Sequence, residues 1–68
     1  MVNSNKLKGV IAERGYSQAK VAEKLGITPK TFYDKMKRQV FDSDEMEIMI
    51  DLLEIQNPVD IFFDNKVT

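Results

Sequence analysis

Four acidic residues lie close together in the second half of the sequence, and their side chains are the first candidates for chemistry. They are Asp42, Asp44, Glu45 and Glu47. A calcium loop would need a glycine turn and a distal glutamate, and a carboxylate pair that acts as acid and base would need a cleft. The segment has neither, whereas Asp42 and Glu45 have the spacing of a helix capping box. We therefore expect these acids to cap a helix and to interact favourably with its dipole.

The residue types that most often perform catalysis are missing from the 68 residues. The chain has no cysteine and no histidine, which excludes disulfides, thiolate metal sites and the commonest general base. We find no pairing of a nucleophile with a base elsewhere. The sequence therefore predicts no enzyme, no metal, no cofactor and no small-molecule substrate, and the lack of cysteine is consistent with a reducing cytoplasm.

Charge is distributed unevenly along the chain, although the net charge is only −1. Residues 1–40 contain nine Lys or Arg and three acids, which gives +6, whereas residues 41–68 contain eight acids and one Lys, which gives −7. Such asymmetry fits a polyanionic partner at one face. It fits equally well two solvated surfaces that differ in sign, so charge alone does not decide the function.

The stretch from Ser17 to Phe32 has the spacing of two helices joined by a sharp turn. It reads Ser-Gln-x-x-Val-Ala-x-x-Leu-Gly-Ile-Thr-x-x-Thr-Phe. Ala22 is small enough for a close helix crossing, and Gly26 permits the turn. Phe32 and Met36 lie at positions i and i+4 of the later helix of this pair. They therefore anchor that helix and leave its opposite face directed outward.

Periodicity and capping signals predict five helices and no strands. The expected helices span residues 4–14, 18–25, 29–37, 43–53 and 58–63, and the tail 64–68 is expected to fray. The expected N-caps are Asn3 or Ser4, then Ser17, Thr28, Asp42 and Asn57. Gly15 and Gly26 suit the left-handed residue that closes a helix. The chain is thus expected to be a single all-α domain over residues 1–68, without a signal peptide or a membrane span.

This sequence resembles the phage repressor and Cro-type helix-turn-helix proteins, the XRE/Cro group. The resemblance covers nearly the whole chain, from about Asn5 to Phe63. It is carried by Leu7, Ile11, Arg14-Gly15, Ser17-Gln18, Val21-Ala22, Leu25-Gly26-Ile27-Thr28, Thr31-Phe32, Lys35-Met36, Phe41, Glu45, Leu52-Leu53 and Ile61-Phe62-Phe63. It implies a compact five-helix, lambda-repressor-like domain in which the second and third helices form a helix-turn-helix.

The resemblance also implies which residues contact DNA. They are Gln18, Thr28, Pro29, Lys30, Tyr33, Asp34, Lys35, Lys37 and Arg38. Gln18 lies where the family contacts the DNA backbone, and the last three lie near the edge where phosphates are expected. Lys30 can donate to guanine, Asp34 can accept from cytosine, and Tyr33 can reach a phosphate or a thymine methyl. Pro29 has no donor and offers only apolar contact.

The function that the resemblance implies is sequence-specific regulation of transcription in the cytoplasm of a bacterium, from a host or phage gene. The partner is double-stranded DNA, read in the major groove at a palindromic operator. A module of this size typically buries only about 600–1,000 Å² on DNA, so a homodimer is expected. The alternative is a helix-turn-helix scaffold that binds proteins, as an antirepressor or accessory subunit, and the acidic residues 41–68 favour it.

Two adjacent phenylalanines near the end of the chain cannot both face the same core. One of Phe62 and Phe63 is expected to pack inward. The other is either covered by the domain itself or exposed in a dimer contact with Ile61 or Val40.

Overall fold

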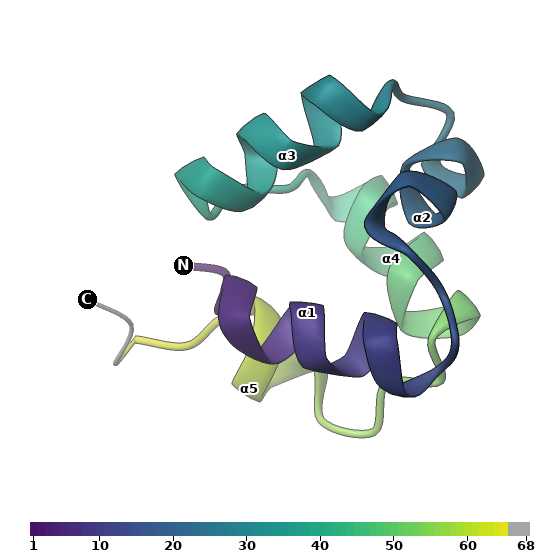
Figure 1. Ribbon diagram of the computed structural model, residues 1–68. Helices are drawn as coiled ribbons and strands as arrows, with labels where there is room; N and C mark the ends of the chain where they lie inside the picture. The colour runs from purple at the N-terminus through teal and green to yellow at the C-terminus, as the bar shows by residue number, and fades with distance from the viewer. Residues whose placement is uncertain (66–68) are drawn as a thin grey trace.

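The computed structural model describes residues 1–65, and this part of the chain contains five helices and no strand (Figure 1). The helices are α1 (Ser4–Glu13), α2 (Gln18–Leu25), α3 (Pro29–Arg38), α4 (Ser43–Leu52) and α5 (Pro58–Phe62). The predicted all-α, five-helix fold is therefore confirmed, and each predicted helix end lies within one residue of the observed end. No helix in residues 1–65 combines the length and the apolar character needed to cross a membrane.

The helices are arranged so that α3 lies along one side of the molecule (Figure 1). α1 and α5 lie on the other side and pack against each other. α2 packs against α1, α3 and α4, and it therefore joins the two sides. The outer side of α3 faces away from the other helices, which is the position that a recognition helix requires.

Side-chain caps explain where the first four helices begin. Asn3, Ser17, Thr28 and Asp42 each accept a hydrogen bond from the backbone N–H three residues later. These four predicted caps are confirmed, and Glu45 completes the capping box with Asp42. Asn57 occupies the predicted N-cap position of α5 with a proline after it, but its side chain makes no capping hydrogen bond.

Two helix ends use glycine as predicted, and two other positive φ angles occur without one. Gly15 and Gly26 have φ angles of 81° and 76°. Gln39 closes α3 with a φ of 60°, and Glu54, just after α4, has a φ of 51°. A side chain in this region is uncommon and costs energy, so the surrounding contacts must hold these two residues in place.

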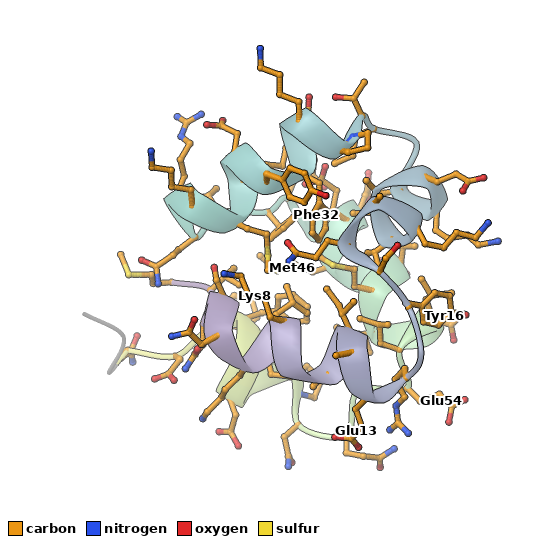
Figure 2. The ribbon with its side chains drawn as sticks, in the orientation of Figure 1. Lys8, Glu13, Tyr16, Phe32, Met46 and Glu54 are labelled. Carbon is orange, nitrogen blue, oxygen red and sulfur yellow. The ribbon has the colours of Figure 1, made fainter. Side chains whose placement is uncertain are left out.

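One hydrophobic core unites the five helices. Its largest fully buried side chains are Phe32, Phe62, Leu7, Met49, Leu53, Val2 and Val21. Phe32 points from α3 into the interior (Figure 2), and its ring centroid lies 5.4 Å from that of Phe41. Ala22 is also fully buried, as expected for a small residue at a helix crossing.

The first three residues join α3 to α5, which the sequence did not predict. The backbone N–H of Val2 donates to the carbonyl of Gln39 at 3.1 Å, and the carbonyl of Met1 accepts from the N–H of Asp64 at 3.1 Å. The side-chain amide of Asn3 also donates to the Asp64 carboxylate at 3.0 Å. The chain is thus held in place at Asp64, inside the tail predicted to fray, and residues 66–68 of that tail lie outside the described residues.

The two adjacent phenylalanines divide as the sequence allowed. Phe62 is buried, whereas Phe63 is 58% exposed. Ile61, one of the two residues suggested to accompany the exposed phenylalanine in a dimer contact, is buried in the core. Val40 is 63% exposed and remains available.

Candidate nucleic-acid interface

α2, the turn and α3 form the helix-turn-helix that the sequence predicted. Gly26 lies in the left-handed region at the end of α2, and the N–H of Ile27 donates to the carbonyl of Ala22 at 3.0 Å. The hydroxyl of Thr28 then accepts from the N–H of Thr31 at 3.1 Å, which starts α3. The turn is therefore closed at both ends by hydrogen bonds, and it fixes the orientation of α3 relative to α2.

The outer side of α3 carries most of the residues predicted to contact DNA. Phe32 and Met36 are buried, and the neighbouring Tyr33 is 48% exposed. The exposed set, which we call the α3 face, consists of Thr28, Pro29, Lys30, Thr31, Tyr33, Asp34, Lys37 and Arg38. Phe32 and Met36 are the only side chains of α3 that are buried in the core, so the exposed residues of the α3 face beyond the capping Thr28 are not held by packing.

Gln18 lies beside the α3 face, where three helices meet. Its half-buried side chain lines a cleft of about 310 Å³ together with Tyr33, Met36 and Lys37 of α3 and Lys8 of α1. Figure 2 shows Lys8 extending from α1 toward α3. Sequence reasoning did not select Lys8, because its position relative to α3 depends on packing between elements far apart in the chain; its only signal was membership of the basic half.

Lys35 lies apart from the α3 face. Its ammonium nitrogen is 2.6 Å from Oε2 of Glu45, and its side chain is only 28% exposed. Oε1 of Glu45 accepts from the N–H of Asp42, so the same carboxylate caps α4 and binds α3. Lys35 thus connects α3 to α4, and we leave it out of the interface proposed below.

The cations of the α3 face differ in how they are paired. Arg38 lies 3.4 Å from the carboxylate of Asp34, and both side chains are largely exposed, so this pair is weak. Lys30 and Lys37 have no carboxylate partner among residues 1–65. The face therefore carries three cations and one anion, which gives it a positive potential.

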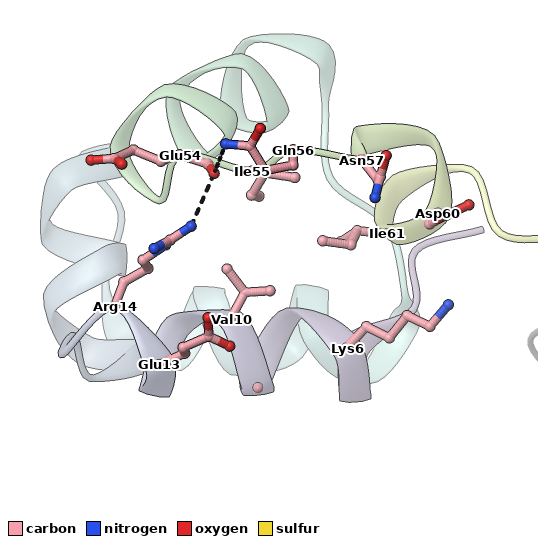
Figure 3. Close-up of a pocket in the computed structure, with 11 residues that line it drawn as sticks. Lys6, Val10, Glu13, Arg14, Glu54, Ile55, Gln56, Asn57, Asp60 and Ile61 are labelled. Atoms are coloured by element: carbon pink, nitrogen blue, oxygen red, sulfur yellow. Dashed lines mark hydrogen bonds between the residues drawn. The ribbon is translucent and has the colours of Figure 1, made fainter.

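A second cleft lies on the opposite side of α1 and has a different character (Figure 3). It is about 470 Å³ in volume and lies between α1 and residues 54–61. Arg14 crosses one end of it and donates to the carbonyls of Leu53 and Glu54 at 2.8 and 3.3 Å, which satisfies the C-terminal end of α4. Glu13 and Asp60 also line this cleft, so it lacks the positive character of the α3 face.

The carboxylates in residues 1–65 do not converge on a metal site, since no three of them gather within coordinating reach. Asp42 and Glu45, two of the four acids that first suggested such chemistry, are engaged in capping α4. The predicted capping role of this pair is confirmed.

A helix-turn-helix whose second helix has an exposed, basic outer side defines the class of DNA-binding regulatory proteins. The family model described as "Bacterial regulatory protein, Fis family" matches residues 3–38, which include all of α1, α2 and α3 and more than half of the chain. The chain therefore belongs to this family, and the family indicates a DNA-binding regulator of transcription. The curated proteins and the solved structures gave no match. The family match supports the predicted helix-turn-helix regulator at a coarser level than the XRE/Cro group.

Proposed function

We propose that the protein is a Cro-like or repressor-like regulator that binds a palindromic operator as a homodimer and blocks a promoter in the bacterial cytoplasm. The gene would belong to a bacterium, a phage or a prophage. The observation that carries the proposal is the exposed, basic α3 face beside a buried anchor, Phe32 and Met36. No cofactor is needed for this function.

In the proposed complex α3 lies in the major groove and its first residues face the base edges. Lys30 is exposed one residue after Pro29, and its ammonium can donate to O6 and N7 of guanine. Tyr33 and Asp34 follow one turn later. The carboxylate of Asp34 pairs with Arg38 and would also accept a hydrogen bond from a cytosine amino group. Gln18, Lys37 and Arg38 would contact the backbone, which supplies most of the affinity.

A homodimer is supported by a group of exposed apolar side chains near the chain ends. These residues, which we call the terminal patch, are Met1, Val40, Val59 and Phe63, and each is 58% or more exposed. The hydrogen bonds from Val2 to Gln39 and from Asp64 to Met1 bring the three segments that carry Met1, Val40 and Phe63 together. An apolar group of this kind on a small domain is typical of a contact with another chain.

The experiment that tests the proposal is selection from random oligonucleotides, followed by titration of the best duplex at several salt concentrations. We expect an inverted repeat with half-site centres about 10 base pairs apart, and an affinity that falls steeply with salt. A selected site without two-fold symmetry would contradict the homodimer. A protein that binds no duplex in dilute salt would contradict DNA binding itself.

A second candidate function is supported by the outer side of α4. Asp44, Glu47 and Asp51 line a shallow groove with the exposed Ile48, and none of the lining residues within the described part of the chain is basic. Such a surface suits a basic, partly apolar protein segment, as the scaffold alternative requires. The two candidates separate in the same titration, because a protein-binding scaffold would show no affinity for any duplex.

A further inference from the structure

The basic residues of the described chain fall into two groups according to whether the fold already uses their charge. Lys6, Lys20, Lys35 and Arg38 pair with Asp64, Glu23, Glu45 and Asp34, and Arg14 donates to backbone carbonyls. The four lysines without a carboxylate partner among residues 1–65 are Lys8, Lys24, Lys30 and Lys37. Two of these four, Lys8 and Lys37, line the same cleft between α1 and α3.

The lining of this cleft is suited to an anion. Among residues 1–65 it is formed by Lys8, Gln18, Tyr33, Met36 and Lys37, none of which carries a carboxylate. Gln18 is also the first residue of α2, so the positive end of a helix lies beside the two ammonium groups. The clefts on the far side of α1 and along α4 both contain carboxylates and would repel the same ligand.

We propose that this cleft is a seat for one backbone phosphate of the DNA duplex, held by Lys8 and Lys37 with Gln18 between α1 and α3. The inference rests on the proposed function and adds α1 to the interface, which the helix-turn-helix alone does not include. The phosphodiester backbone of DNA is the class of ligand that fits. Each of its phosphates is a compact anion, and the backbone runs alongside a helix inserted in the major groove. A phosphate fixed on this side of α3 would set the angle at which α3 enters the groove.

The first test compares two lysines of α1 that differ in direction. Lys8→Ala removes a charge from the seat, whereas Lys6→Ala removes the same charge from the opposite side of the helix, next to Asp64. On a mixed-sequence duplex, Lys8→Ala should weaken binding roughly tenfold at 50 mM salt and lower the slope of log K against log salt by about 0.9. Lys6→Ala should leave the slope unchanged, and circular dichroism should show both variants folded.

The second test locates the phosphate on the selected operator, or on a fixed mixed-sequence duplex, with one uncharged methylphosphonate placed at each linkage in turn. Wild type should lose affinity at every linkage whose phosphate it contacts, and at one of these linkages per bound protomer Lys8→Ala and Lys37→Ala should both lose less than wild type. Different linkages for the two variants would show that they contact separate phosphates and would overturn the shared seat.

The outcomes also separate this inference from the proposed function. If wild type binds duplex DNA and Lys8→Ala behaves like Lys6→Ala, the phosphate seat is wrong and DNA binding through the α3 face stands. If wild type binds no duplex, the proposed function fails and the seat fails with it. Equal weakening by Lys8→Ala on all sequences, with unchanged base preference, would support both.

Discussion

α3 and α4 are helices of equal length and opposite charge, and they differ in how their charged residues are used. Each has ten residues and a side-chain N-cap. In α3, Lys30 and Lys37 are exposed and unpaired among residues 1–65, whereas in α4 Glu45 is buried and hydrogen-bonded to both Asp42 and Lys35. The fold therefore needs one ion pair where the two helices meet, and it leaves the remaining charge on α3 for a partner.

The largest effect on stability is expected from a substitution on the inward side of α3. Phe32 is fully buried and lies against Phe41, so Phe32→Ala should lower the free energy of unfolding by about 3–5 kcal/mol. Tyr33→Ala, the matched change at an adjacent and half-exposed ring, should lower it by less than about 1 kcal/mol. Chemical denaturation followed by circular dichroism measures both values. Similar losses for the two variants would contradict the division of α3 into a buried side and an exposed side.

The next largest effect is expected on DNA binding and not on the stability of the fold. Lys30 is exposed and unpaired in the described chain, so Lys30→Ala should leave the melting temperature nearly unchanged. On the selected operator it should weaken binding by about 1–3 kcal/mol and relax the preference at one base position. Fluorescence anisotropy with single-base operator variants measures this preference. If Lys30→Ala weakened binding equally on all sequences, Lys30 would contact a phosphate and another residue would read the base.

The ion pair between the two helices should have a smaller effect on folding. In Glu45→Gln, the amide oxygen can still accept from Asp42, but the charge opposite Lys35 is lost. Because Lys35 remains partly exposed, we expect a loss of about 1–2 kcal/mol, below the cost of breaking a fully buried pair. Glu47→Gln is the control, since Glu47 is an exposed acid of the same helix and should change stability by less than about 0.5 kcal/mol. Equal losses of stability in Glu45→Gln and Glu47→Gln would show that the ion pair between Lys35 and Glu45 does not stabilise the fold.

The sequence was most informative where the determining contact is local. The caps at Ser17, Thr28 and Asp42 depend on a residue only three positions later, and Gly26 has the φ angle that its turn requires. The inward position of Phe32 follows from helical periodicity. These signals were sufficient to predict five helices, a helix-turn-helix and most of the α3 face.

The features that were missed depend on contacts between residues far apart in the chain. Val2 is buried because its N–H reaches Gln39, 37 residues later, and the side chain of Arg14 reaches Leu53, 39 residues later. Lys35 looked like its neighbour Lys37 in the sequence, and only the position of α4 separates the two. Lys8 joins the cleft beside α3 for the same reason. Residue spacing within one helix contains no information about any of these distances.

The smallest changes in stability and in DNA binding are expected at Asp34, the one anion of the α3 face. Its pairing with Arg38 at 3.4 Å is exposed, so Asp34→Asn should change the free energy of unfolding by no more than about 0.5 kcal/mol. Removing the anion should strengthen binding to mixed-sequence duplex by roughly 0.5 kcal/mol, because a carboxylate near phosphates is repelled. Asp51→Asn makes the same charge change on the exposed side of α4 and should leave duplex binding unaltered at physiological salt, where the Debye length is only about 8 Å. If both variants strengthened binding equally, net charge and not the position of α3 would control the affinity, and the contrast between the two helices would not account for it.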